Sequence, residues 1–148
     1  MKYYVIYPEV AGELGEKSEI IYESGKIKDV VSLEYVFTGW QGDEILTTHP
    51  CFIITENMKN SIIMAKLKGA KIENIKIAFS EEFIELYGKI DVPNFFRIKP
   101  TDLYEKNIDN LDNDFYYNRY KDLVISEKAL EVIKKHKIDM CLIEEIER

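Results

Sequence analysis

Hydrophobic and polar positions alternate along the first quarter of the chain in a pattern typical of β-strands. Apolar residues dominate Tyr3–Tyr7 and Glu19–Glu23, and the segment between these runs holds one proline and two glycines. Val30–Phe37 alternates again and is rich in β-branched and aromatic residues. Short runs of this kind, bounded by turn-forming residues, predict three strands.

Two later segments share one pattern, in which a short apolar run leads into a helix. The first begins at Cys51 and the second at Asp122, and each run ends in a hydroxyl residue followed by glutamate. Thr55 and Ser126 are natural N-caps, because a hydroxyl oxygen accepts a hydrogen bond from a free amide in the first helical turn. The glutamate that follows lies at the positive end of the helix dipole. We expect a helix after each cap and then a second strand, with Gly69 at the end of the first helix.

The rest of the chain is less regular. Residues 81–90 fit a short helix or a strand, and Asn94–Ile98 fits a strand that is ended by Pro100. The acidic and aromatic segment 101–120 has weak periodicity, so we expect a loop or an irregular helix over the core. A chain of 148 residues is expected to form a single domain, residues 1–148. The predicted class is α+β, with a mixed or largely antiparallel sheet and two to three helices packed on one side.

The charge balance bears on the class of partner. The chain has 27 acidic and 20 basic residues, a formal net charge of −7, and arginine is scarce. Nucleic-acid binding needs clustered lysine and arginine against the phosphates, so we expect no nucleic-acid partner. The excess acid fits solubility, or a surface that meets a basic protein.

Membrane insertion and secretion are not expected either. No apolar run approaches the roughly 18 residues needed to cross a bilayer. The first ten residues carry one lysine and a five-residue apolar run that ends at Pro8, without a small-residue cleavage site. We therefore expect a cytoplasmic protein.

The cysteines and histidines give little sign of catalysis. Cys51 and Cys141 lie far apart, each in an apolar run, so two buried thiols are favoured over a disulfide. His49 and His136 are the only candidate bases for a thiol, and no glycine-rich oxyanion loop accompanies either of them. The cysteine spacing also lacks the CxxC pattern of zinc sites. We expect neither thiol catalysis nor a bound metal or cofactor.

Acidic residues form two further candidate sites. Asp43 and Glu44 are adjacent, and paired carboxylates can act in acid–base chemistry, although a polar turn between two β segments is the favoured interpretation. Asp109, Asp112 and Asp114 resemble the alternating ligands of a calcium loop, but the glycine and the closing glutamate of such a loop are missing. We interpret this second group as a solvated acidic loop without a metal.

Aromatic residues gather beside the second acidic group. They are Tyr104, Phe115, Tyr116, Tyr117 and Tyr120. Tyrosine supplies contact area and a hydroxyl at little entropic cost, so this cluster fits a protein interface. The same side chains could instead cover the sheet, and the sequence leaves both interpretations open.

The turns and caps together form a pattern that extends beyond a single element. The turn Gly42–Ile45 precedes an apolar strand that ends in Thr55 and Glu56, and Leu123–Glu127 repeats the strand and its cap before a final strand that ends in Glu144–Ile146. This arrangement resembles immunity proteins of bacterial polymorphic-toxin systems, in particular a group first catalogued as a domain of unknown function. The likeness covers the last two thirds of the chain and is strongest near its C-terminal end.

The resemblance implies a protein without enzymatic activity that binds a cognate toxin domain and blocks the toxin's active site. Because toxins that act on nucleic acid are commonly basic, an acidic surface that bears tyrosines fits such a partner. The expected contact residues are Asp109, Asp112, Asp114, Tyr116 and Tyr117, with Asp43 and Glu44 as a second candidate.

Two alternatives come from other functional classes. One is a small enzyme that uses Asp43, Glu44 and His49. The other is a regulatory module that binds a small ligand in a groove beside the sheet and has no catalytic activity. Neither alternative has a motif comparable with the repeated strand and capped helix, and the sequence does not set the oligomeric state.

Overall fold

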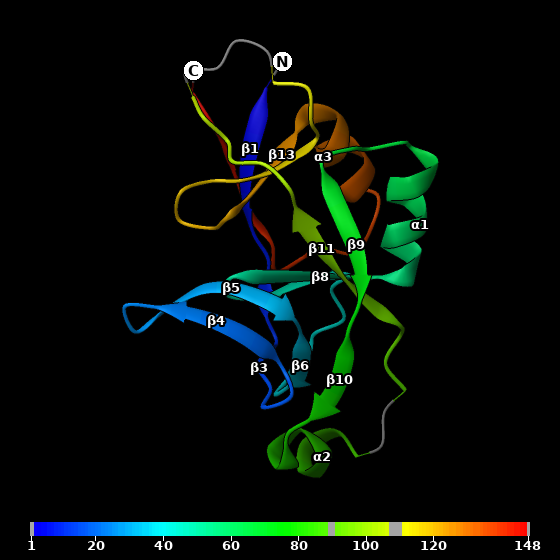
Figure 1. Cartoon of the computed structure of the whole chain (residues 1–148). Helices are drawn as coiled ribbons and strands as arrows, with labels where there is room; N and C mark the ends of the chain where they lie inside the picture. The colour runs from blue at the N-terminus through cyan, green and yellow to red at the C-terminus, as the bar shows by residue number, and fades with distance from the viewer. Residues whose placement is uncertain (1, 89–90, 107–110, 148) are drawn as a thin grey trace.

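The computed structural model describes residues 2–88, 91–106 and 111–147. Within these ranges the chain forms helices and many short strands (Figure 1). The helices are α1 (Glu56–Met64), α2 (Glu81–Tyr87) and α3 (Glu127–Ile133). The strands are β1 (Tyr3–Tyr7), β2 (Glu9–Val10), β3 (Gly12–Leu14), β4 (Glu19–Glu23), β5 (Lys26–Ser32), β6 (Glu34–Phe37), β7 (Ile45–Thr48), β8 (Cys51–Thr55), β9 (Ala70–Asn74), β10 (Lys76–Phe79), β11 (Phe95–Pro100), β12 (Phe115–Tyr117), β13 (Leu123–Ser126) and β14 (Leu142–Glu145).

Two sheets hold most of the strands. The four-stranded sheet has the order β12-β13-β1-β14 and is antiparallel throughout. The five-stranded sheet has the order β2-β7-β8-β11-β9, and its edge pair β2–β7 is parallel while the other pairs are antiparallel. A three-stranded sheet, β10-β6-β3, and the hairpin β4-β5 complete the described strands. The predicted α+β class and its mixed pairing are confirmed.

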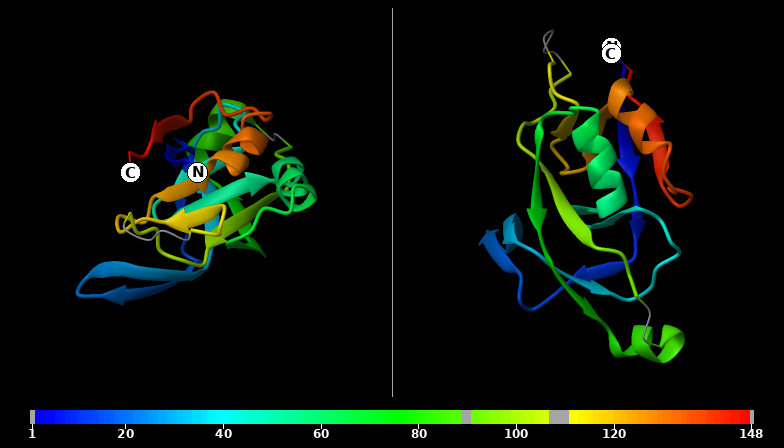
Figure 2. Two further views of the ribbon diagram at one scale, coloured as in Figure 1. Left: turned by 90° about the horizontal axis from the view of Figure 1, so that it is seen from above. Right: turned by 90° about the vertical axis from the view of Figure 1, so that its right-hand side faces the viewer.

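Strand β1 lies between the last two strands of the chain. Tyr4 pairs with Ile125 of β13 on one side and with Glu145 of β14 on the other. The two chain ends therefore lie close together (Figures 1 and 2). Helices α1 and α3 lie side by side near these ends, whereas α2 lies at the opposite end of the molecule (Figure 2).

Strand β8 is shared by the two main hydrophobic clusters, and all five of its residues are buried. Phe52 and Ile54 join the cluster that α1 and α3 cover. Cys51 and Ile53 join the other cluster, which also contains Phe37. Because successive side chains of a strand point to opposite faces, one short strand supplies both clusters. This two-sided burial explains why the segment reads as a continuous apolar run rather than as an alternation.

Each helix begins at a hydroxyl cap. The side-chain oxygens of Thr55, Ser80 and Ser126 accept hydrogen bonds from the amides three residues later, at 3.2, 3.0 and 3.0 Å. The predicted caps at Thr55 and Ser126 are confirmed, and residues 81–87 are helical rather than extended.

The prediction that Gly69 ends the first helix is wrong. Helix α1 ends at Met64, and Lys66 takes the left-handed conformation with φ 56°. Gly69 has φ 102°, and a Cβ there would lie 2.5 Å from the Cβ of Asn113. The glycine is therefore required by the close approach of a distant segment and not by the helix end.

The single strand expected over Val30–Phe37 is two strands, β5 and β6, with Leu33 between them. The backbone of Glu34 is hydrogen-bonded to Ser18 and Gly15, at 2.8 Å for each, and not to β4. Consecutive residues therefore enter different sheets. Among the residues that the structure describes, no helix is both long enough and apolar enough to cross a membrane.

We predict that Ser126→Ala destabilises the protein by about 2–3 kcal/mol, whereas Ser80→Ala costs about 1 kcal/mol. Both serines cap a helix, but Ser126 is fully buried and also donates to Asp114 Oδ1 at 2.7 Å. Its loss leaves a buried carboxylate oxygen without that partner. Urea denaturation of the two variants measures the difference, and equal losses would contradict the role given to the Asp114 contact.

Candidate functional site

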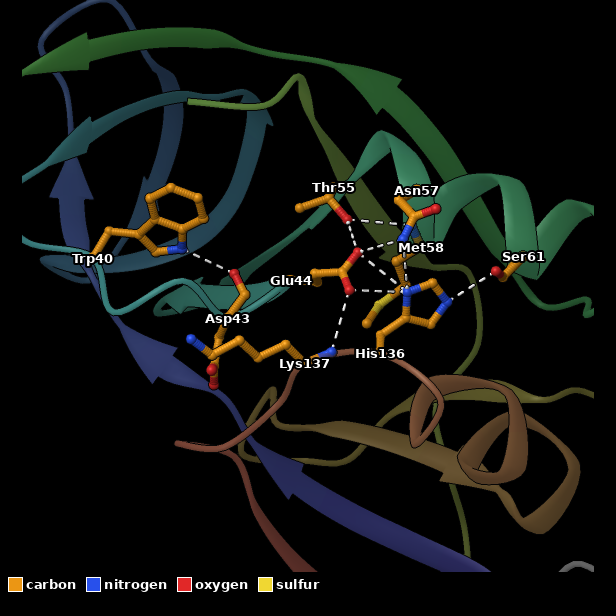
Figure 3. A network of polar contacts seen from close by, with 9 residues as sticks. All are labelled: Trp40, Asp43, Glu44, Thr55, Asn57, Met58, Ser61, His136 and Lys137. Atoms are coloured by element: carbon orange, nitrogen blue, oxygen red, sulfur yellow. Dashed lines mark hydrogen bonds and ion pairs between the residues drawn. The ribbon is translucent and has the colours of Figure 1, made fainter. Parts of the chain in front are cut away.

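The carboxylate of Glu44 joins three separate segments of the chain (Figure 3). Glu44 lies just before β7, and its Oε1 accepts hydrogen bonds from Thr55 Oγ1 at 2.7 Å and from Asn57 Nδ2 at 3.1 Å. Its Oε2 accepts from the Lys137 amide at 3.2 Å. His136 Nδ1 lies 3.1 Å from both carboxylate oxygens. The loop before β7, the start of α1 and the segment after α3 thus meet at one side chain.

A serine extends this network on the far side of the imidazole. His136 Nε2 lies 2.8 Å from Ser61 Oγ, in the body of α1, and the His136 side chain is only 6% exposed. The order serine, histidine, carboxylate matches that of a nucleophile, a base and the acid that orients the base. The arrangement therefore has to be tested as a candidate active site.

The surrounding donors are already engaged in structural contacts. Acyl transfer requires hydrogen-bond donors aimed at the developing oxyanion. The Lys137 amide donates to Glu44, the Met58 amide to the Thr55 cap, and the Glu56 amide to the Asn94 carbonyl at 2.9 Å. These amides are therefore not free for a substrate, and the network acts as a clasp between the loop, α1 and the end of α3.

The Glu44 contacts hold its carboxyl in the ionised state. Burial raises the pKa of Glu44, but the hydrogen bonds from Thr55, Asn57, Lys137 and His136 outweigh it, and the pKa lies below its ordinary value of 4.5. An acid whose pKa is lowered stays charged at neutral pH, so Glu44 does not act as a proton donor there.

Asp43 has a different structural role from its neighbour. It is fully buried, and its carboxylate accepts hydrogen bonds from the amides of Asp139 at 3.1 Å and Met140 at 2.8 Å. Its carbonyl accepts from Trp40 Nε1 at 2.9 Å. Asp43 therefore fixes the turn that leads into β14, and the expectation that it lies on a contact surface is corrected.

The candidate contact residues near β12 are divided between the interior and the surface. Asp114 is 7% exposed and accepts from Ser126 and from the Lys68 amide at 3.0 Å, and Tyr116 is 4% exposed. These two are buried because the segment packs inward onto β13, which corrects the expectation of an exposed surface there. Asp112 is exposed and Tyr117 is partly buried, while Asp109 lies outside the described residues.

Tyr116 belongs to an aromatic cluster inside the fold. Its ring lies 5.8 Å from that of Tyr3 and 6.0 Å from that of Tyr104, both in edge arrangements. Its hydroxyl accepts a hydrogen bond from the Asn113 amide at 2.9 Å. Of the two interpretations that the sequence left open, Tyr116 fits sheet cover. Tyr120 differs, because it is 62% exposed.

The thiols and the second histidine do not form a reactive pair. Cys51 and Cys141 are both free cysteines, and burial is the main cause that raises the pKa of each to about 11. A thiol with such a pKa is a weak nucleophile at neutral pH. His49 is exposed in the turn between β7 and β8, and Glu44 pairs with His136 instead. Across the described residues no group of three or more His, Cys, Asp or Glu side chains could hold a metal.

The exposed surface of helix α2 combines apolar and acidic side chains. Three of its apolar side chains are exposed, Ile84 at 51%, Leu86 at 73% and Tyr87 at 45%. The other exposed residues of the helix are all glutamates, Glu81, Glu82 and Glu85, and the helix contains no lysine or arginine. Phe83 is buried and holds the helix against Phe37 and Phe79. We call Glu81–Tyr87 the acidic tip.

Sequence reasoning missed both the tip and the clasp. The tip was read as a short helix or strand, and its exposure depends on the tertiary placement of α2. The clasp joins Glu44 to a histidine 92 residues away.

No protein-family model matches the chain, and comparison with curated protein sequences finds no significant match.

We predict that Glu44→Gln lowers the free energy of unfolding at pH 7 by about 1.5–3 kcal/mol, because the charged acceptor of several hydrogen bonds is lost. The folded-state pKa of Glu44 is lowered, so its contribution is complete above pH 4.5 and is lost as the pH falls through the folded-state value. The difference in the free energy of unfolding between wild type and variant should therefore be smaller in acid.

Denaturation at pH 7 and at pH 3.5 measures this difference. Glu131→Gln, on the exposed side of α3, is the matched control and should change stability little at either pH. A difference that stays constant between the two pH values would contradict the charge-based role of Glu44.

Proposed function

We propose that the protein is an immunity protein, a binding protein without enzymatic activity that docks on a basic toxin domain and blocks the toxin's active site. The acidic tip is the observation that supports this proposal. It joins exposed apolar area to three carboxylates on one short helix, at the end of the molecule opposite the two chain ends (Figure 1).

The chemistry of the tip favours a basic partner. Exposed apolar residues, among them Leu86 and Tyr87, supply the area that anchors an interface. The glutamates around them would speed association with a positive surface and disfavour acidic partners. A cleft that binds nucleic acid is lined by lysine and arginine, so a narrow acidic tip can occupy it in place of the phosphates.

Two further observations agree with the proposal. The formal net charge of −7 extends the attraction for a basic partner beyond the tip itself. In the Ser61–His136–Glu44 chain, which most resembles catalytic machinery, the Glu44 carboxylate is also bound by Thr55 and by the Lys137 amide, which gives it a structural role. The resemblance of the sequence pattern to immunity proteins supports a toxin domain as the class of partner.

We predict that the protein binds the C-terminal domain of a toxin whose gene lies next to its own, and that Glu82→Lys weakens this binding by about tenfold or more, equivalent to about 1.4 kcal/mol. Glu131→Lys on α3 is the control. Both variants change the net charge by the same amount, so only the position of the charge differs. Calorimetric titration at two salt concentrations measures affinity, and the affinity should fall with added salt.

A second pair of variants tests the apolar part of the tip. Leu86→Ala should weaken binding, whereas Leu142→Ala should not, although the two leucines are equally exposed at 73% and 70%. Recovery of toxin activity in the presence of each variant gives an independent readout. Absence of binding at micromolar concentrations would contradict the proposal for that neighbour. Light scattering that shows a dimer dissociated by Leu86→Ala would assign the tip to a second copy of this chain instead.

A further inference from the structure

A small cavity lies between β5, β11 and the segment that follows β12. Its volume is about 210 Å³. It is lined by Lys28, Asp29, Pro50, Arg97, Tyr117 and Lys121. Three of these side chains are cationic and one is anionic, in a protein whose formal net charge is −7. The local charge is therefore opposite to that of the molecule as a whole.

Arg97 is the most unusual member of this group. It is 1% exposed, its Nη1 donates to the Val30 carbonyl, and its Nε has no hydrogen-bond partner among the described residues. A buried guanidinium is unfavourable unless its donors are paired, because the charge loses its water, and here the Nε donor is left without a partner in the described chain. The sites that retain such a group are commonly functional.

The carboxylates nearby also pair with other cations. Asp29 accepts from Lys99 Nζ at 3.1 Å, and Lys28 Nζ lies 3.6 Å from Glu23. Among the described residues, Lys121 Nζ donates to two carbonyl oxygens, at 3.3 Å to Ile27 and more closely to Lys28. Asp29 also lies close enough to Arg97 for the guanidinium charge to help lower the Asp29 pKa, so this one carboxylate serves both Lys99 and Arg97. The side chains that line the cavity therefore keep an excess of positive charge.

A second, larger cavity continues from the first. It has a volume of about 440 Å³ and shares Tyr117 and Lys121 with the Arg97 cavity. Leu103 and Arg119 also line it. Burial is the main cause that raises the pKa of Tyr117 to about 12, so its phenol stays protonated and can donate a hydrogen bond. The pair of cavities thus offers a cationic compartment beside a partly apolar one.

We propose that the Arg97 cavity binds a phosphate group, either free or as the ester of a small organic molecule whose other part lies in the second cavity. A phosphate dianion matches the excess of two positive charges among the side chains that line the cavity, three of which are cationic and one anionic. The planar guanidinium suits phosphate oxygens, and hydrogen bonds between charged partners are about twice as strong as neutral ones. The cavity of about 210 Å³ has room for a phosphate group, and the rest of an ester would lie in the second cavity. This site goes beyond the proposed toxin contact and lies apart from α2.

Calorimetric titration with inorganic phosphate at constant ionic strength tests the site, with acetate and phenyl phosphate as further probes. We expect phosphate to bind, and Lys121→Gln to weaken it by about tenfold. Lys128→Gln, an exposed lysine of α3 with the same change in charge, should leave the affinity unchanged. Tighter binding of phenyl phosphate would identify an ester as the ligand, and equal binding would identify free phosphate.

A second readout does not depend on the stability of a variant. The Arg97 Nε–H resonance in nitrogen-15 NMR should shift on addition of phosphate, because this group has no other partner in the described chain. Arg97→Lys keeps the charge but removes the planar fork, so it should weaken binding while the fold is kept. The proposal is overturned if phosphate leaves the resonance unchanged, if acetate binds as tightly, or if Lys121→Gln and Lys128→Gln lose affinity equally.

Discussion

The hydrogen-bonded carboxylate of Glu44 is the contact on which the arrangement of the C-terminal half depends. It holds the start of α1 through Thr55 and the end of α3 through His136. A charge that leaves water is unfavourable unless its hydrogen bonds replace the lost solvation, and here several donors do so at 2.7 to 3.2 Å. The adjacent Asp43 fixes the turn before β14, which then pairs with β1. Two neighbouring acids thus determine where the last third of the chain returns to the first strand.

The clasp and the acidic tip involve different helices, and this separation bears on function. The tip is carried by β10, which pairs in parallel with β6, and it is anchored by Phe83 in the cluster that contains Phe37. The clasp lies beside the other cluster, and β8 forms part of both. A partner that binds the tip therefore contacts a surface whose own residues, apart from Phe83, contribute little to the core. Such a surface can change in sequence without loss of the fold, which suits recognition of one partner among many.

Local sequence patterns were sufficient to predict helices and strands, but not the contacts between them. Thr55 and Ser126 were identifiable as caps because a hydroxyl and an amide three residues later meet whatever the tertiary structure. The burial of Asp114 was not identifiable, because the acid lies in a polar, aspartate-rich segment and is buried only where Ser126 and the Lys68 amide approach it. The contact between Glu44 and His136 could not be predicted either, because a pairing across 92 residues produces no periodic pattern in the sequence. The α+β class followed from patterns, whereas the exposure of α2 followed from packing.

The protein carries two local electrostatic fields of opposite sign, a negative one at the glutamates of α2 and a positive one at the Arg97 cavity. The distance between them decides whether they interact. At physiological ionic strength the interactions of exposed charges are screened over about 8 Å. The glutamates of α2 are exposed, so their field reaches solvent and would steer the proposed basic partner before contact. Arg97 is enclosed, so its field acts within the cavity and is weakly screened. A bound phosphate would neutralise the second field and leave the first unchanged. The molecule can therefore combine an acidic recognition surface with an internal anion site, because each field is confined to its own environment.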